Sequence, residues 1–133
     1  MMETIAANTE TSFAPVLYMP VVADALAYYQ KAFNAVELRR WSGGDGTIHV
    51  AEMTIGNAMF HLHEITGKDA HFNEQPHSFI TLGLFTANPD MMMQQALDAG
   101  GKLLNPMQDY DYGYRQGDVL DPFGHKWTLQ QKI

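Results

Sequence analysis

Two histidines one residue apart could present their imidazole rings side by side. His61 and His63 lie in the run from Ala58 to Glu64, whose pattern predicts a β-strand, and alternate side chains of a strand share a face. Glu52 lies in the preceding predicted strand, and two histidines with one carboxylate can form a facial metal site. These residues, with His77 as a further candidate, could therefore hold Zn, Ni, Fe or Mn.

The same residues also have a simpler interpretation. His61 and His63 would then be polar side chains on the wall of a cavity, and His77 would belong to a linker. Glu52 on a cavity wall would suit a general base that removes a proton next to a carbonyl group. Alternatively, Glu52 would be an ion-paired carboxylate on an antiparallel strand.

Other residues could bind a ligand without transforming it. The planar guanidinium of Arg115 could hold a carboxylate or phosphate, or it could form a structural salt bridge with Asp118 or Asp121. Aromatic side chains often line small-molecule pockets, but they are more often part of the core. The aromatic candidates are Tyr18, Phe79, Tyr114 and Trp127.

The composition narrows the class of protein. The 133 residues, 46% of them hydrophobic, suffice for one domain with its own core. The net charge of −7 disfavours nucleic acid or an anionic membrane surface as a partner, because both attract basic surfaces. Without cysteine, a metal would need His, Asp or Glu ligands. Residues 1–12 lack the pattern of a signal peptide and no apolar run could span a membrane, so we expect a flexible tail and a cytoplasmic protein.

Five elements are predicted in the first half of the chain. Phe13 to Val22 is a β-rich run that contains two prolines. Asp24 is a good N-cap for the helix that follows, and Asn34 can end this helix in the left-handed conformation. Three strands complete the half, over Ala35 to Trp41, Ile48 to Ile55 and Ala58 to Glu64.

The second half repeats this order. Phe79 to Phe85 is an apolar strand, and Asn88 with Pro89 begins a helix that Gly100 closes. Lys102 to Met107 is the next strand.

A hairpin over Tyr114 to Gln130 ends the second half. Its tight turn is Asp121-Pro122-Phe123-Gly124, because proline presets the first turn position and glycine allows a positive φ. We expect Asp121 to serve this turn rather than chemistry.

These elements predict an α+β fold of two βαβββ modules in a single domain, residues 13–133. The first module covers residues 13–64, a linker covers 65–77, and the second module covers 78–130. The halves share almost no residue identity, and the repeat lies in the element order and the matching helix caps. The alternative is an unrelated α+β sandwich of the same elements.

Three motifs add a family resemblance. They are Tyr28-Tyr29-Gln30-Lys31-Ala32-Phe33, then Ala51-Glu52-Met53, and finally Tyr112-Gly113-Tyr114-Arg115-Gln116-Gly117 leading to Asp121-Pro122-Phe123-Gly124-His125-Lys126-Trp127. With the doubled element order, they make the chain resemble the vicinal oxygen chelate superfamily of glyoxalase I, bleomycin-resistance proteins and extradiol dioxygenases. Within that superfamily the motifs resemble the PhnB-like branch, also labelled 3-demethylubiquinone methyltransferase-like. Tyr112 and Asn34 stand where that branch often has Trp and Gly.

The resemblance implies incomplete barrels that line a small-molecule cavity, and a homodimer. Metal-dependent relatives carry four ligands, and the positions that correspond here are Leu17, Glu52, Thr81 and Thr128. Leucine cannot bind a metal and threonine is a poor ligand. The resemblance therefore implies that the usual metal centre is absent.

We expect a homodimer that binds a small anionic or aromatic molecule, without a metal cofactor. The predicted ligand-binding residues, with Glu52 as the candidate general base, are Tyr18, Glu52, His61, His63, Thr81, Arg115 and Trp127. The alternative is a metal-dependent lyase, isomerase or dioxygenase built on Glu52, His61 and His63. A third hypothesis is an interaction domain with a closed cavity.

Overall fold

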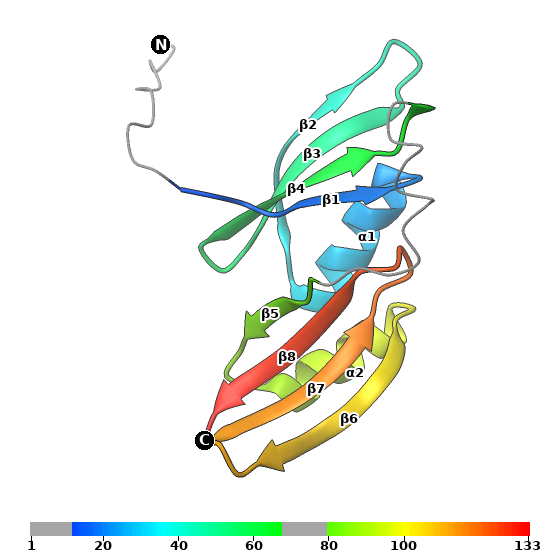
Figure 1. Ribbon diagram of the computed structural model, residues 1–133. Coiled ribbons are helices and arrows are strands. Elements are labelled where there is room, and N and C mark those ends of the chain that lie inside the picture. The colour runs from blue at the N-terminus through cyan, green and yellow to red at the C-terminus, as the bar shows by residue number, and fades with distance from the viewer. Residues whose placement is uncertain (1–11, 68–79) are drawn as a thin grey trace.

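A computed structural model describes residues 12–67 and 80–133, which form two modules with the same order of elements (Figure 1). The first module contains β1 (Val16–Met19), α1 (Val22–Phe33), β2 (Val36–Ser42), β3 (Ile48–Ile55) and β4 (Ala58–Glu64). The second contains β5 (Leu82–Phe85), α2 (Pro89–Asp98), β6 (Lys102–Tyr110), β7 (Tyr114–Leu120) and β8 (Lys126–Lys132). The predicted α+β class and the two βαβββ modules are confirmed.

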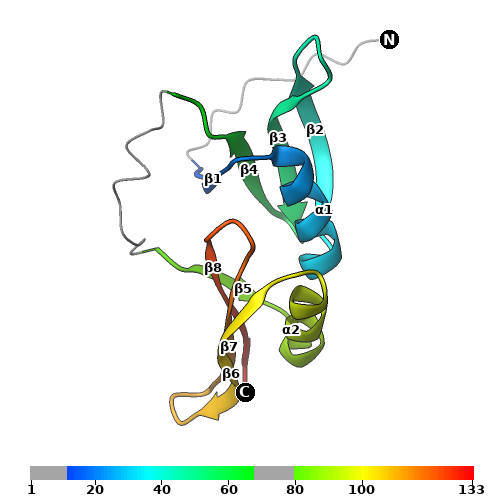
Figure 2. The same cartoon turned by 90° about the vertical axis from the view of Figure 1, so that its right-hand side faces the viewer.

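Each module forms one mixed four-stranded sheet. The strand orders are β1-β4-β3-β2 and β5-β8-β7-β6, with β1 parallel to β4 and β5 parallel to β8. Figure 2 shows α1 and α2 stacked on the same side of the two sheets. The sheets do not close into a barrel. Each sheet has one face that is covered by its helix and one face without a helix, which we call the open face.

Helix α1 begins earlier than the sequence predicts. It starts at Val22, and Val21 occupies the cap position without a side-chain hydrogen bond, so the prediction of Asp24 as the N-cap is wrong. Asp24 lies in the first turn, where its charge is favourable beside the positive end of the helix dipole. The predicted end is confirmed, because Asn34 adopts the left-handed conformation with φ 56°.

Helix α2 begins as the sequence predicts. The side-chain oxygen of Asn88 accepts a hydrogen bond from the backbone N–H of Met91 at 3.1 Å, and Pro89 occupies the first helical position. Proline has no N–H to leave unpaired at that position, so the helix start costs no hydrogen bond there.

The predicted turn between β7 and β8 is confirmed. Gly124 has φ 94°, and its N–H donates to the carbonyl of Asp121 at 3.2 Å. One carboxylate oxygen of Asp121 accepts the backbone N–H groups of Phe123 and His125, both at 2.9 Å. The turn is therefore fixed by a side chain as well as by its backbone.

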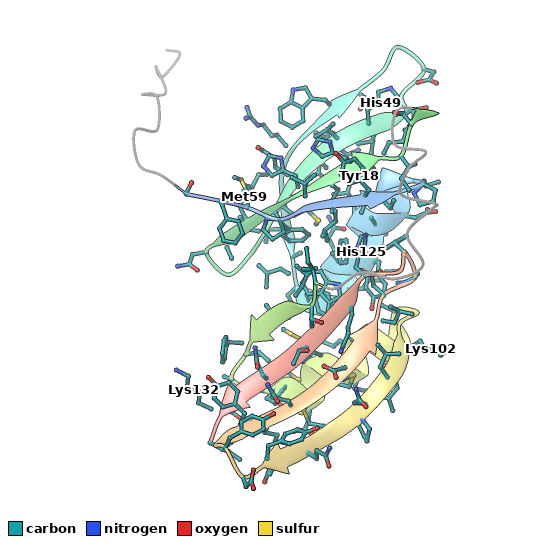
Figure 3. All side chains as sticks on the ribbon, viewed as in Figure 1. Tyr18, His49, Met59, Lys102, His125 and Lys132 are labelled. Carbon is teal, nitrogen blue, oxygen red and sulfur yellow. The ribbon has the colours of Figure 1, made fainter. Side chains whose placement is uncertain are left out.

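The two modules share one aromatic core. Trp127 of the second module packs against Phe33 and Tyr29 of the first, with ring centroids 4.6 and 5.5 Å apart. The second carboxylate oxygen of Asp121 accepts hydrogen bonds from the Tyr29 hydroxyl at 2.6 Å and from the Trp127 indole at 2.9 Å. His125 lies at the junction of the modules, with its Nε2 2.8 Å from the carbonyl oxygen of Tyr18 (Figure 3).

In the part of the chain that the structure describes, no helix is both long and apolar enough to cross a membrane. Several sequence predictions concern residues that the structure does not describe. The tail up to residue 11, most of the predicted linker with His77, and the predicted strand residue Phe79 all lie outside the described residues.

Candidate functional site

The open face of the first sheet carries a row of polar side chains. Ala51 and Met53 of β3 are fully buried beneath α1, so Glu52 between them points to the opposite face. The strand register places Glu52 beside Arg39 of β2 on one side and beside His61 of β4 on the other. Alternation along β3 and β4 therefore brings Glu52 and His61 together, as the sequence predicts.

Arg39 reaches this row because β2 is irregular. Glu37 pairs with Met53, whose side chain is in the core, yet Arg39, two residues later, pairs with Glu52. Leu38 is the extra residue of a β-bulge, and a bulge reverses the face of the residues that follow it. Strict alternation would have placed Arg39 on the helix-covered side, which is why sequence reasoning missed it.

The contacts of Glu52 define the chemistry of the row. Its side chain is largely buried, and one carboxylate oxygen accepts a hydrogen bond from Arg39 Nε at 2.7 Å. The other oxygen lies 3.5 Å from His61 Nε2, which is longer than a typical hydrogen bond. Glu52 is thus an ion-paired carboxylate that still has one oxygen beside an imidazole.

Aromatic rings lie on the same face of the sheet as this carboxylate. The guanidinium carbon of Arg39 lies 4.6 Å from the centre of the Trp41 ring. The rings of His61 and His63 lie 6.1 Å apart, and the ring of Tyr18 lies 5.5 Å from that of His63. Three of the predicted ligand-binding residues, Tyr18, His61 and His63, therefore share one face with Glu52.

A pocket of about 450 Å³ lies beside this row, between the edge strands β1 and β5. Its walls are mainly apolar and come from β1, the β3–β4 turn, β5 and β8. They include Val16, which pairs with His61 in the sheet, and Met59, labelled in Figure 3. The predicted residues Thr81 and Trp127 also line the pocket, although Trp127 is only 4% exposed and serves the core as well.

Arg115 does not belong to this site. It forms ion pairs with Asp90 at 2.7 Å and Asp109 at 2.9 Å, and Asp90 belongs to α2, so Arg115 lies on the helix-covered side of the second sheet. These carboxylates raise the pKa of its guanidinium further above the usual value. A structural salt bridge was a correct alternative, but the predicted partners, Asp118 and Asp121, are wrong.

The open face of the second sheet carries its own polar network, which sequence reasoning missed. Asp118 accepts hydrogen bonds from Thr128 and Asn105, both at 2.6 Å. Gln116 donates to Gln130 at 2.6 Å. These groups satisfy one another, and no periodicity or motif in the sequence marks them in advance.

The positions that the family resemblance assigns to metal ligands do not fit a resident metal. Leu17 has no donor atom, Glu52 already accepts from Arg39, and the Thr128 hydroxyl donates to Asp118. Across residues 12–67 and 80–133, no group of three or more His, Cys, Asp or Glu side chains is placed to hold a metal ion. The set of Glu52, His61 and His63 is therefore not assembled as a metal site.

Comparisons with known proteins agree with this fold. The model of the glyoxalase/bleomycin resistance protein/dioxygenase superfamily matches residues 13–129. An uncharacterised protein of Mycobacterium tuberculosis (strain CDC 1551 / Oshkosh) is 34% identical over 136 residues, which cover 98% of this chain and 80% of that protein.

Two solved structures have a similar fold. TioX from Micromonospora sp. ML1 is 20% identical with a TM-score of 0.72, over 92% of this chain and 97% of that one. The fosfomycin resistance protein FosX from Listeria monocytogenes, complexed with Mn(II) and sulfate, is 14% identical with a TM-score of 0.71, over 95% and 92% of the two chains. At these identities the likeness is one of fold.

Proposed function

We propose that this chain, which belongs to the glyoxalase/bleomycin resistance protein/dioxygenase superfamily, binds a small apolar or aromatic molecule. The binding site is the pocket between β1 and β5. The observation that carries this proposal is the pocket itself. A volume of about 450 Å³ with mainly apolar walls is in the range of pockets that hold small molecules. Sequestration of the bound molecule, without a resident metal, is the simplest activity of such a site.

A neutral fluorescent probe tests the proposal. N-phenyl-1-naphthylamine brightens in apolar surroundings, so we expect its fluorescence to rise when it enters the pocket. Val16→Phe should weaken its binding, because Val16 lines the pocket and the larger ring would fill it. Val36→Phe is the matched control, because Val36 is an exposed valine of the same sheet and does not line the pocket. Equal binding in the two variants, or no binding to the wild type, would contradict the proposal.

The metal-dependent alternative rests on the approach of His61 to Glu52 at 3.5 Å. Elemental analysis of protein purified without chelator, before and after exposure to Zn, Ni, Fe and Mn, separates the two hypotheses. About one metal per chain, lost in a His61→Ala/His63→Ala variant, would favour the alternative and overturn binding without a metal.

We also propose that the chain forms a homodimer through apolar side chains that lie outside the pocket. Burying exposed apolar surface favours association, and the large apolar side chains exposed outside the pocket include Leu38, Phe85, Met91 and Leu104. The mass in solution, measured by light scattering, tests this proposal, and a single-chain mass at micromolar concentration would contradict it.

A further inference from the structure

Arg39 is held in a fixed orientation at the edge of the candidate site. Its Nε donates to Glu52 at 2.7 Å, and its guanidinium lies over the Trp41 ring at 4.6 Å. An unrestrained arginine loses much rotamer entropy when it binds a ligand, and these two contacts reduce that loss. The side chain of Arg39 is therefore preorganised to contact a ligand.

The donors that Arg39 still offers become clear by comparison with its neighbour. Arg40 lies on the other face of β2 and uses both Nε and a terminal nitrogen on the carboxylate of Glu37, at 2.6 and 2.7 Å. Arg39 bonds to Glu52 through Nε alone, and its side chain is 62% exposed. Within the described part of the chain, its terminal amino groups therefore have donors left for a ligand.

An anion is the ligand that these donors recognise. A guanidinium fork matches the oxygens of a carboxylate, phosphate, phosphonate or sulfonate. The whole chain carries a net charge of −7 and repels anions in general, so an anionic ligand needs a local cation. Arg115 cannot provide this cation, because its guanidinium is ion-paired with Asp90 and Asp109. It also lies on the helix-covered face of the second sheet.

The position of Arg39 relates this anion site to the pocket. The strand register places Val16, His61, Glu52 and Arg39 in one row across the first sheet. Val16 lines the pocket and Arg39 ends the row, and four adjacent strands span about 14 Å. With the reach of the arginine side chain, one molecule of moderate size could contact both.

We propose that Arg39 binds the anionic end of the molecule whose apolar part occupies the pocket. The ligand class is then an amphiphilic organic anion, an apolar or aromatic body with one carboxylate, phosphoryl or sulfonate group. This inference rests on the proposed function, which supplies the pocket. Glu52 acts on this ligand as a positioning residue, through its hydrogen bond to Arg39.

Two dyes with the same skeleton test this inference separately from the proposed function. 8-Anilinonaphthalene-1-sulfonate carries a sulfonate that N-phenyl-1-naphthylamine lacks. We expect the wild type to bind the sulfonate more tightly than the neutral dye. Arg39→Gln should weaken sulfonate binding roughly tenfold, the loss expected for one hydrogen bond to a charged group, and leave neutral-dye binding unchanged.

Arg40→Gln is the matched control, because it removes the same charge one residue away from the other face of the strand. It should leave the binding of both dyes unchanged. An equal loss in the two variants would show a general charge effect and would overturn the inference, as would unchanged sulfonate binding in Arg39→Gln. Either result with normal neutral-dye binding would leave the proposed function standing.

A second measurement covers the case in which neither dye binds, which would contradict the proposed function. The ¹H–¹⁵N NMR signals of the arginine Nε–H groups can be followed during titration with sodium methanesulfonate. A saturable shift of the Arg39 signal with no shift of the Arg40 signal would support the anion site. No shift of the Arg39 signal would overturn it.

Discussion

The carboxylate of Asp121 receives four hydrogen bonds from two different modules. Two come from backbone N–H groups of its own turn, one from the Trp127 indole, and one from the Tyr29 hydroxyl of α1. Its side chain is almost fully buried, and a buried charge is tolerated only when it is well satisfied. The sequence assigns Asp121 to the turn correctly, but its contact with Tyr29, 92 residues away, follows from tertiary packing alone.

Tyr29 gives the protein a predictable response to alkaline pH. Burial, followed by the negative charge of Asp121, raises the pKa of the Tyr29 hydroxyl well above its usual value. In the unfolded chain this hydroxyl ionises near pH 10, while in the folded protein it stays protonated. The unfolded state then binds fewer protons than the folded state, so the stabilisation is present below about pH 10 and decreases as the pH rises further.

We therefore expect Tyr29→Phe to reduce this alkaline loss. The wild type should lose up to about 1.4 kcal/mol of unfolding free energy per pH unit through Tyr29 between about pH 10 and 11, and the variant should lack that contribution. Urea unfolding at several pH values measures it. Parallel curves for the two proteins would contradict the assignment.

At the residue scale, simple alternation along a strand predicts that Glu52, His61 and His63 share a face, and the structure places them on one face. Nothing in the sequence indicates that Arg39 joins them, and the predicted ligand-binding residue Arg115 lies on the other sheet. Arg39 faces Glu52 because one extra residue in β2 reverses the face of the side chains that follow it. Nothing in the sequence around Leu38 indicates that bulge.

At the element scale, the two helices begin differently although the sequence predicts caps of the same kind. Asn88 accepts a hydrogen bond from the N–H of Met91, whereas Asp24 lies within the first turn of α1 and does not occupy its cap position. Pro89 fixes the start of α2 and so places Asn88 at the cap. In α1 the helix begins at Val22, soon after Pro20 and before Asp24. The presence of a good cap residue at position 24 could not predict this earlier start.

We expect the two corresponding alanine variants to differ. Asn88→Ala should lower the free energy of unfolding by about 1 kcal/mol, because it removes a cap hydrogen bond. Asp24→Ala should cost only a few tenths, the size of a favourable charge in the first turn. Urea denaturation measures both, and a larger loss from Asp24→Ala would show that Asp24, and not Val21, caps α1.

At the scale of the whole molecule, the order of elements was predictable because hydrophobic periodicity, caps and turns repeat in the two halves. How the halves pack was not predictable. Their contact depends on Tyr28, whose hydroxyl donates to the carbonyl of Ala96 in α2 at 3.2 Å, and on the approach of Gly101 to both groups. Contacts between distant segments leave no periodic signal in a single sequence.

Gly101 provides a test of this packing. A Cβ atom there would lie 2.6 Å from the Tyr28 hydroxyl and 2.8 Å from the Ala96 carbonyl oxygen, closer than such atoms can approach. Gly101→Ala should therefore lower the free energy of unfolding by roughly 1–3 kcal/mol, the usual cost of overpacking. Gly44→Ala is the control, because an added Cβ there meets nothing within 4 Å. Equal thermal stability of the two variants would mean that the modules do not pack as described.

The bulge at Leu38 has a second consequence, for aggregation. Strand β2 is the outer edge of its sheet, and a straight edge strand can pair with a strand of another molecule. The bulge breaks the regular spacing of its hydrogen-bonding groups, and charged Arg39 and Arg40 follow it. Deleting Leu38 would remove this bulge and leave only the register shift between Trp41 and Ser42, and light scattering should then detect faster aggregation on heating. The irregularity that turns Arg39 toward Glu52 thus also protects the chain from uncontrolled assembly.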